Sequence, residues 1–360
     1  MEKSLAAYFK NKNVLITGGA GSIGSQIARK LLDCKTKLIR ILDIDETAQF
    51  ELEHELLKEY GRNGARFLMG DIRDHLRMKR ALENIDVVFH AAALKHVPSC
   101  EYNAFEAVKT NVQGTQNVIE AAMENDVEKF ITISTDKAVN PVNVMGATKL
   151  LAERLTISAN YYKGDRKTVF SCVRFGNVWG SSGSVVPVFT RQIKHGGPVT
   201  ITDPDMTRFV MSTDRAVELV LKAVQMSKGG EVFIFKMPSL RIGDLAEALI
   251  DELAPKYGYR PGNIKTKIIG IRPGEKFHEE LMTEEESVWA RETKEMLIVQ
   301  PPIELPGFTL KTPGNLLNVP LTEAYVSKKR RKVTSKNVPL LGKAEIRKLV
   351  KEKEVHNAHH

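Results

Sequence analysis

An acid and a base stand side by side in the middle of the chain. Asp136 directly precedes Lys137, and a second lysine, Lys149, follows twelve residues later. A carboxylate and an amine held together can release and take up protons in one reaction, which is general acid–base chemistry. The apolar run 129–134 predicts a buried strand, and 145–162 predicts a helix. The pair therefore follows a strand end, where open α/β sheets bind their ligands.

A glycine-rich turn near the N-terminus predicts a dinucleotide site. Residues 13–17 predict a short strand, and a helical pattern follows the turn to about Asp33. Gly18 permits the tight turn, Gly21 lets a pyrophosphate approach the backbone, and Gly24 allows the helix to pack closely on the strand. The phosphates would lie at the N-terminus of the helix.

The choice of cofactor depends on the end of the next strand. Asp43 follows the predicted strand 38–42, where its carboxylate can accept hydrogen bonds from the adenosine ribose and repel a 2′-phosphate. We therefore expect NAD, with NADP the less favoured cofactor. The alternative is that Asp43 only caps the helix that begins near Glu46.

Two further strand ends point to the same site. Asp71 ends the predicted strand 66–71 and could meet the adenine, and strand 86–90 runs into small side chains against which a cofactor could lie. These small residues are Ala91, Ala92 and Ala93. Lys95 follows in the loop, where it could contact a phosphate or a sugar or simply be solvated.

Strands alternate with helical segments along the chain, which predicts an α/β fold with a Rossmann-like, doubly wound parallel sheet. We assign residues 1–180 to an NAD(P)-binding domain. Residues 181–300 form a smaller C-terminal α/β part that mainly binds substrate, with some elements returning to the sheet. Residues 301–360 form a basic extension. A long helix is expected at about 103–125, and Asn111 within it could turn its amide toward the site.

The composition limits the class of protein. Hydrophobic residues make up 42% and charged residues 27%, as in soluble globular proteins. With no apolar run of membrane-helix length and no signal peptide, we expect a cytoplasmic protein without a membrane span. Cys34, Cys100 and Cys172 fit reduced thiols better than disulfides or a metal site, and no metal is expected.

The net charge of +9 is concentrated near the C-terminus. Residues 321–355 contain eleven Lys or Arg residues and four Glu residues. A localised basic tail is more typical of a solvated or partner-contacting surface than of a nucleic-acid reader, so we expect no nucleic-acid partner. The basic string 327–332 is similar to a nuclear-localisation signal, a pattern with many false positives.

Several motifs together resemble one enzyme family. The glycine turn, the three alanines, the run Ser134–Lys137 and Lys149 resemble the extended short-chain dehydrogenase/reductases. The sequence between Ser134 and Lys149 resembles, more narrowly, the UDP-N-acetylglucosamine 4,6-dehydratases. Three later motifs resemble them too, namely Arg174–Val178, Asp203–Phe209 and Arg272–Lys276. The similarity covers about residues 10–300 and is to the soluble short form rather than to membrane-anchored relatives.

The resemblance implies a UDP-N-acetylglucosamine 4,6-dehydratase that works by internal hydride transfer through bound NAD(P). In the family reaction carbon 4 of the sugar is oxidised, the carbon 6 hydroxyl leaves with the proton of carbon 5, and the hydride returns to carbon 6. The product, a UDP-2-acetamido-2,6-dideoxy-4-keto-hexose, would serve surface polysaccharide or glycan biosynthesis. A homo-oligomer, dimer or hexamer, is implied as well.

The resemblance also implies the catalytic roles. Lys137 is the base at carbon 5, Asp136 the acid for the departing hydroxyl, Thr135 a hydrogen-bond partner near the 4-oxygen, and Lys149 the group that orients the nicotinamide ribose. Met145 stands where the wider superfamily has a proton-accepting tyrosine, and a thioether cannot replace it; a subset of the dehydratases shares this methionine. We hypothesise that Asp136 first accepts the 4-hydroxyl proton and then gives it to the leaving 6-hydroxyl.

The remaining expected contacts divide between cofactor and substrate. Arg191, Arg208 and Arg272 could grip a diphosphate, because guanidinium groups bind oxygen pairs in bidentate geometry; the alternative for each is an ion pair. The cofactor site is completed by Ser22, Ile23, Ile72, Lys149 and Val178. The substrate site is completed by Lys95, Asn177, Ser182, Val185, Thr202 and Glu275.

Two other functions remain open. A UDP-N-acetylhexosamine 4-epimerase would need the ketone but no elimination, so the Asp136–Lys137 pair would have less to do. A non-catalytic dinucleotide-binding protein could have lost the tyrosine, but the retention of Lys149 and of the pair argues against it. Loss of water from the substrate separates a dehydratase from an epimerase.

Overall fold

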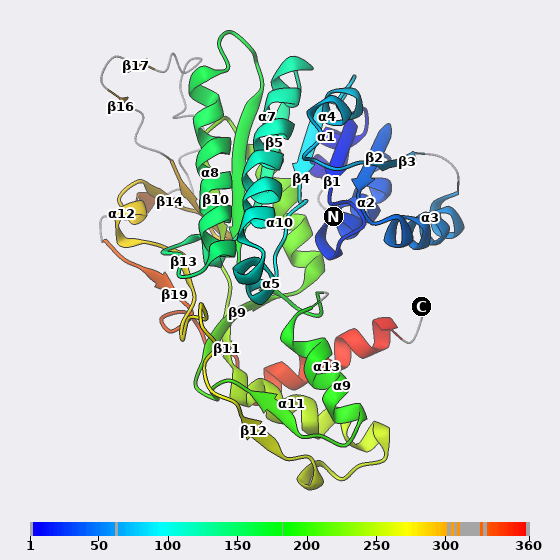
Figure 1. Cartoon of the computed structure of the whole chain (residues 1–360), viewed down its shortest axis with the longest axis vertical. Helices are drawn as coiled ribbons and strands as arrows, with labels where there is room; N and C mark the ends of the chain where they lie inside the picture. Colours follow the sequence, from blue (N-terminus) through cyan, green and yellow to red (C-terminus); the bar gives the residue numbers. More distant parts are fainter. Residues whose placement is uncertain are drawn as a thin grey trace. The chain divides into compact units, whose positions relative to one another are not determined.

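The computed structural model describes residues 3–61, 64–181, 183–300, 304–305, 308–309, 325–326 and 330–357. The chain divides into two compact units (Figure 1). Unit 1 consists of Met1–Phe175, Thr213–Lys236 and Met282–Lys332. Unit 2 consists of Gly176–Ser212, Met237–Leu281 and Val333–His360. The assignment of cofactor and substrate binding to separate domains stays a prediction.

Unit 1 is built on one large sheet. In the described part of the chain it has ten strands in the order β18-β14-β15-β10-β6-β5-β4-β1-β2-β3. The parallel strands are β1 Asn13–Thr17, β2 Leu38–Asp43, β3 Ala65–Met69, β4 Val87–His90, β5 Lys129–Thr135, β6 Val169–Phe175 and β10 Val232–Phe235. The antiparallel edge strands are β14 Ala290–Glu292, β15 Met296–Val299 and β18 Tyr325–Val326.

The strand order reverses beside β1, which makes this edge of the sheet a binding site by topology. The chain runs from β1 to β2 and β3 on one side, then crosses to β4, β5 and β6 on the other. In doubly wound sheets, ligands bind at the carboxyl ends of the strands at this switch point. The Rossmann-like prediction is confirmed.

Helices cover both faces of this sheet (Figure 1). On one face α4, α7 and α8 share an apolar cluster with β1, β4, β5 and β6. On the other, α1, α2 and α10 pack together. The helices of unit 1 are α1 Lys3–Phe9, α2 Ser22–Asp33, α3 Glu46–Tyr60, α4 His75–Ala81, α5 Val97–Tyr102, α6 Ala104–Val108, α7 Thr115–Glu124, α8 Val144–Tyr162, α10 Thr213–Met226 and α12 Glu284–Ser287.

The helix expected at about 103–125 is confirmed as a contiguous helical segment from Ala104 to Glu124, with one local irregularity. A π-helical turn, η1 (Lys109–Gly114), separates α6 from α7. Asn111 within this turn is buried and hydrogen-bonded outside the helix. Gly114 lies so close to Ile72 that an added Cβ would come within 2.6 Å of its side chain. Such π-turns often occur at functional sites.

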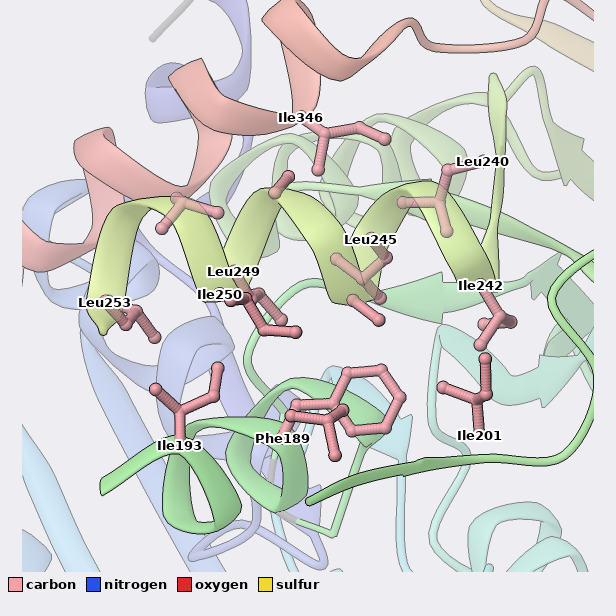
Figure 2. Packing of buried hydrophobic residues seen from close by; sticks show 14 of the residues in the cluster. Phe189, Ile193, Ile201, Leu240, Ile242, Leu245, Leu249, Ile250, Leu253 and Ile346 are labelled. Carbon is pink, nitrogen blue, oxygen red and sulfur yellow. The ribbon is translucent and has the colours of Figure 1, made fainter. Parts of the chain in front are cut away.

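Unit 2 is a smaller α/β body. Its strands are β7 Asn177–Val178, β8 Val199–Ile201, β9 Thr207–Met211, β11 Ser239–Arg241, β12 Thr266–Ile268 and β19 Val333–Thr334, the last paired with β13 Glu280–Met282. Its helices are α9 Val185–Lys194, α11 Ile242–Leu253 and α13 Lys343–Asn357. The core lies around α11, where Leu245 and Leu249 face Phe189 and Ile193 of α9 (Figure 2).

Part of the basic C-terminal region packs on unit 2. Lys343, Arg347 and Lys351 of α13 form ion pairs with acidic residues of α11 and remain largely exposed, and the expected solvated or partner-contacting role stays a prediction. Residues 327–329 of the predicted basic string lie outside the described residues, and Arg331 in its other half pairs with Glu292. Among the helices that the structure describes, none has the length and apolar character needed to cross a bilayer.

Candidate active site

The acid–base pair lies in a short helical turn at the carboxyl end of β5. Asp136 Oδ1 lies 2.8 Å from Thr135 Oγ1, which donates to it, and 3.0 Å from Lys137 Nζ. The Asp136 side chain is 0% exposed, whereas that of Lys137 is 24% exposed. The carboxylate is therefore shielded from water, while the lysine can exchange its proton with solvent. This contrast suits two groups that hold protons at different steps.

The first turn of α8 packs directly against this pair. Asn143 caps the helix, because its Oδ1 accepts a hydrogen bond of 2.7 Å from the Gly146 backbone N–H. A Cβ on Gly146 would lie 2.3 Å from the Lys137 carbonyl oxygen, so only glycine allows this approach. One turn later the buried Lys149 donates from Nζ to the Ile133 carbonyl at 2.7 Å. Three predicted catalytic residues, Asp136, Lys137 and Lys149, are thus brought to one strand end.

Lys149 is held in a state that titrates near neutral pH. Burial lowers its pKa to about 8, although the nearby carboxylate of Glu153 acts in the opposite direction. A lysine with a lowered pKa is common at catalytic sites. The assignment of Lys149 to the nicotinamide ribose stays a prediction.

Replacing Lys149 by methionine tests this environment without any ligand. Between pH 8 and 10.5 the unfolded chain binds the lysine proton and the folded chain does not, so folding stability rises with pH. The free energy of unfolding of the wild type, measured relative to Lys149→Met, should therefore rise by about 1.4 kcal/mol per pH unit in this range. Urea titrations at several pH values measure it, and parallel curves for the two proteins would contradict the lowered pKa.

Met145 fills apolar space and offers no proton acceptor. Its side chain is buried in a small cluster with Cys100 and Ala107, and Val97 packs against this cluster. Met145 therefore contributes packing between α5, α6 and α8. Met145 therefore cannot accept the 4-hydroxyl proton in place of the tyrosine. The hypothesis that Asp136 accepts this proton and later donates it, a proton relay, stays a prediction.

Asn111 joins the loop after β4 to helix α8. Its Oδ1 accepts from the Leu94 N–H at 2.8 Å, and its Nδ2 donates to the Leu94 carbonyl at 2.9 Å and to Thr148 Oγ1 at 3.0 Å. Asn111 thus fixes the residue before Lys95 and the residue before Lys149. In the sequence, an asparagine inside a predicted helix indicated a special role for Asn111. The spacing of residues could not show that its partners are Leu94 and Thr148.

His90 is a buried polar residue near the site that the sequence analysis did not single out. Its Nδ1 lies 2.8 Å from Thr17 Oγ1, and its Nε2 lies 2.9 Å from Thr115 Oγ1. Burial, with a further contribution from Lys149, lowers its pKa to about 3, so the ring is neutral. His90 therefore links the strand before the glycine turn to the first residue of α7. The sequence offered one indication of this residue, a histidine at the end of an apolar strand.

The glycine turn has the geometry of a phosphate cradle. Gly18 has φ +65°, and a Cβ there would lie 2.6 Å from the Ala92 backbone. A Cβ on Gly24 would lie 2.3 Å from the Gly18 carbonyl oxygen. Helix α2 begins at Ser22 with no side-chain cap and no acidic residue in its first turn. Its positive dipole end therefore suits an anion, and these residues fit a dinucleotide.

The Asp43 side chain bonds to this turn and does not cap the next helix. Its Oδ2 accepts from the Ala20 N–H at 2.9 Å and its Oδ1 from the Ile44 N–H at 2.8 Å. The cap of α3 is Asp45, whose side chain accepts from the Ala48 N–H. The helix-cap alternative for Asp43 is therefore wrong, and its carboxylate stands beside the glycine turn.

The other residues predicted for the cofactor differ in placement. Asp71 accepts hydrogen bonds from Arg73, which hold its pKa below the usual value against the raising effect of burial. Ile72 is buried against Gly114, and Ser22 and Ile23 form the first turn of α2. The segment Ala91–Ala93 follows β4 and is half-buried. Val178 belongs to unit 2, and its cofactor role stays a prediction.

Unit 2 contains a small, partly open pocket of its own. Asn177, Val185 and Arg208, all predicted to bind substrate, line it. Its walls are otherwise mainly apolar and include Trp179 and Phe209. A mostly apolar pocket with one buried cation is typical of a site for a charged organic molecule.

Arg208 is held in place by several acceptors. Its Nη2 lies 3.0 Å from Glu275 Oε1, and its Nη1 donates to the carbonyl oxygens of Thr207 at 2.8 Å and Phe277 at 3.2 Å. Glu279 Oε1 lies 3.9 Å from Arg208 Nε. Glu275 is therefore the partner of Arg208, and an anion would have to replace or share that contact.

The other residues predicted for the substrate are less clearly placed. Arg272 is exposed in the turn that leads to Glu275, whose N–H donates to its carbonyl. Thr202 donates to the Met206 sulfur at 3.1 Å. Arg191 is exposed at the end of α9, and neither it nor Thr202 is among the described residues that line the pocket. Lys95 lies in unit 1. Ser182 lies outside the described residues.

The sheet, the glycine turn and the acid–base pair define a protein with the short-chain dehydrogenase/reductase fold. The structure of a dTDP-glucose 4,6-dehydratase from Streptomyces venezuelae with NAD and TYD bound has this fold, with a TM-score of 0.64 and 23% identity over 74% of this chain and 86% of that chain. More narrowly, the chain belongs to the polysaccharide biosynthesis protein family, which matches residues 14–301.

Relatives with known names fall mainly in nucleotide-sugar chemistry. A UDP-N-acetylglucosamine 4,6-dehydratase (inverting) from Campylobacter jejuni is 45% identical, covering 82% of this chain and 85% of the relative. An uncharacterized membrane protein from Methanocaldococcus jannaschii is 65% identical, covering 84% and 89%. A UDP-glucose 4-epimerase from Rickettsia canadensis is 41% identical, covering 79% and 81%.

One solved structure is similar over nearly the whole chain. The X-ray structure of Pen from Bacillus thuringiensis has a TM-score of 0.86 and 45% identity, covering 96% of this chain and 98% of that chain. These comparisons establish the family and the fold of the chain, and they identify the class of protein as a nucleotide-sugar enzyme.

Proposed function

We propose that this chain is a UDP-N-acetylglucosamine 4,6-dehydratase that forms a 4-keto-6-deoxy sugar nucleotide for polysaccharide biosynthesis. The observation that carries the proposal is the buried Asp136 carboxylate bonded to both Thr135 and Lys137 at the end of β5. Oxidation alone needs one proton acceptor, whereas elimination needs an acid and a base together. The relatives named as dehydratases support it.

The cofactor that suits the glycine turn is NAD, which when bound supplies reversible hydride transfer between carbon 4 and carbon 6 of the sugar. Helix α2 would hold its pyrophosphate, Asp43 its adenosine ribose and Lys149 its nicotinamide ribose. The lysine bond to the Ile133 carbonyl fixes the ammonium at the strand end. These residues bind and orient the cofactor, while proton movements fall to the acid–base pair.

Asp136 serves as acceptor and then as donor. As a carboxylate paired with Lys137 it takes the proton from the 4-hydroxyl, with Thr135 aligning the same Oδ1. The protonated acid then gives this proton to the departing 6-hydroxyl, which leaves as water. One side chain thus carries the same proton between two oxygens of the sugar, and no tyrosine is required at position 145.

Lys137 removes the proton at carbon 5. When Asp136 is protonated, Lys137 loses its paired charge, and this favours the neutral amine. Its 24% exposure lets it release its proton to water before it acts as base. The same exposure predicts that the proton returned to carbon 5 comes from solvent.

The unit 2 pocket recognises the nucleotide end of the substrate. Its apolar walls would take the uracil and ribose, and Arg208 would bind the diphosphate. The Glu275 partner keeps the guanidinium oriented before substrate arrives. Arg272, in the adjoining exposed turn, would add a second cation.

The experiment is incubation of the purified protein with UDP-N-acetylglucosamine in deuterated water. We expect a product that is lighter by one water molecule after allowance for the label, with one deuteron at carbon 5. Because the relative is named as inverting, we propose inversion at carbon 5, which proton coupling constants in the product report. An isomer of unchanged mass would instead identify the 4-epimerase suggested by the relatives of that name.

The preference for NAD can be tested at Asp43. We expect the wild type to bind NAD more tightly than NADP, because the carboxylate repels a 2′-phosphate. Asp43→Ser should reduce the ratio of the two dissociation constants by about tenfold. Asp45→Ser is the matched control, since serine also caps helices well. An unchanged ratio in Asp43→Ser would remove Asp43 from cofactor selection.

Two wider properties belong to this proposal. We propose that the enzyme works in the cytoplasm, which the buried cysteines Cys34, Cys100 and Cys172, none of them in a disulfide, support. We also propose a homo-oligomer, a dimer or hexamer, which sedimentation would measure.

The substrate is a UDP-sugar, and no metal is required for the steps assigned to Asp136 and Lys137.

A further inference from the structure

The C-terminal segment of unit 2, residues 333–351, lies beyond the part of the chain that the family match covers. It nevertheless contacts the elements that bear the pocket. Strand β19 pairs with β13, residues 339–341 bond to β11, and α13 packs on α11. Both β11 and α11 contribute pocket-lining residues, including Leu240 and Leu245.

Ser335 makes the most specific of these contacts. Its side chain is 0% exposed. Its Oγ donates to the Thr207 carbonyl oxygen at 3.2 Å, lies 2.6 Å from Thr207 Oγ1, and accepts from the Glu279 N–H at 2.9 Å. The Ser335 N–H also donates to the Glu279 carbonyl at 2.8 Å. One serine therefore fixes both Thr207 and Glu279.

These two residues flank the Arg208 guanidinium. The Thr207 carbonyl that accepts from Ser335 also accepts from Arg208 Nη1 at 2.8 Å. Glu279 Oε1 lies 3.9 Å from Arg208 Nε. Without the Ser335 hydroxyl, the Thr207 carbonyl and the Glu279 N–H would each lose a hydrogen bond, and the guanidinium would lose part of its fixed frame. A planar cation binds a diphosphate well only when its orientation is fixed in advance.

The rest of the segment holds this serine in place. The Ser239 N–H donates to the Pro339 carbonyl, and the Leu341 N–H donates to the Ser239 carbonyl. Farther on, Ile346 of α13 packs onto α11 from the side opposite α9 (Figure 2).

Three ion pairs join the same two helices. They are Lys343–Glu247, Arg347–Asp251 and Lys351–Glu252. Each lies at the surface and is individually weak, but the regular spacing along α13 aligns the helix on α11.

We propose that Ser335 is a positioning residue for Arg208, through which the C-terminal segment sets the affinity of the unit 2 pocket for the diphosphate of a UDP-sugar. The inference rests on the proposed function, because it assigns a diphosphate to this pocket. It adds a residue outside the motifs to the recognition of substrate. Ser335 touches no substrate itself and acts through Thr207 and Glu279.

The test is titration calorimetry with UDP on the full-length protein, together with steady-state kinetics. Ser335→Ala should raise the dissociation constant for UDP, and the KM for UDP-N-acetylglucosamine, by about tenfold, while kcat stays within about twofold. Ser239→Ala is the matched control. Ser239 is as buried as Ser335, but it bonds to the segment through its backbone, so UDP affinity should not change.

Wild-type UDP affinity in Ser335→Ala would overturn the inference, and so would a fall in kcat with unchanged KM. If this variant does not fold, the double variant Lys343→Glu/Arg347→Glu replaces it, since like charges would then oppose Glu247 and Asp251. It should weaken UDP binding by about threefold, and Glu247→Lys/Asp251→Lys should restore it. An unchanged affinity of Lys343→Glu/Arg347→Glu for UDP would overturn the inference. If the wild type binds no UDP, the proposed function fails as well.

Discussion

The Asp136→Asn variant is expected to lose oxidation of the substrate as well as elimination of water. An amide cannot accept the 4-hydroxyl proton, and Met145 offers no substitute because its thioether is buried among apolar side chains. We expect the rate of ketone formation to fall by about 10³-fold, the usual effect of removing a general acid–base group. Single-turnover absorbance of the reduced cofactor measures this step directly.

The alternative outcome is equally clear. If Asp136→Asn reduces the cofactor at the wild-type rate and stops only before water leaves, Asp136 is the acid alone and the relay is wrong. Asp74→Asn provides the control, because Asp74 caps α4 and asparagine caps equally well. That variant should keep wild-type kinetics and thermal stability.

The Lys137→Met variant is expected to separate oxidation from elimination. Asp136 remains to accept the first proton, so the ketone forms, but carbon 5 has no base. We expect turnover to fall by about 10³-fold while reduced cofactor and keto-sugar accumulate on the protein. Mass spectrometry of the quenched mixture in deuterated water measures the result, since carbon 5 should keep its proton.

Lys79→Met is the control for this substitution. Lys79 is 56% exposed and pairs with Glu124 at the surface, so its loss should leave turnover unchanged. Full turnover of Lys137→Met, or deuteron exchange at carbon 5 in that variant, would remove Lys137 as the base. The two variants together distinguish an acid–base pair from a pair that only stabilises the turn.

The parallel sheet could be predicted because its strands are continuous apolar runs. The residues from Asn13 to Thr17 and from Lys129 to Thr135 are bounded by glycine or polar turns and buried on both faces. The edge strands β14, β15 and β18 were not predicted. They are short. Although β14 and β15 form a local hairpin, they join the sheet through the pairing of β15 with β10, far earlier in the chain, and local patterns do not contain that pairing.

The residues that carry chemistry could be predicted better than their partners. Spacing placed Asp136, Lys137 and Lys149 near one strand end. It could not show that Arg174 forms a buried network with Glu153 and Glu286, which is 112 residues away. The same holds for Ser335 and Thr207, separated by 128 residues. Such contacts follow from the fold and not from sequence periodicity.

The C-terminal basic region shows a packing role that charge alone could not predict. Its lysines and arginines predicted a solvated or partner-binding surface. In α13 every fourth residue from Lys343 to Lys351 meets an acid on α11, and Ile346 and Val350 between them enter the core. A helix can expose its charges and still be an integral part of a domain.

The measurement that tests the central claim most directly uses UDP-N-acetylglucosamine carrying deuterium at carbon 4. A dehydratase working by internal hydride transfer moves this label to carbon 6, so the product methyl group should carry one deuteron and the product should lack one water molecule. A label that returns to carbon 4 in a product of unchanged formula would identify an epimerase and contradict the account. Loss of the label to solvent would exclude internal transfer altogether.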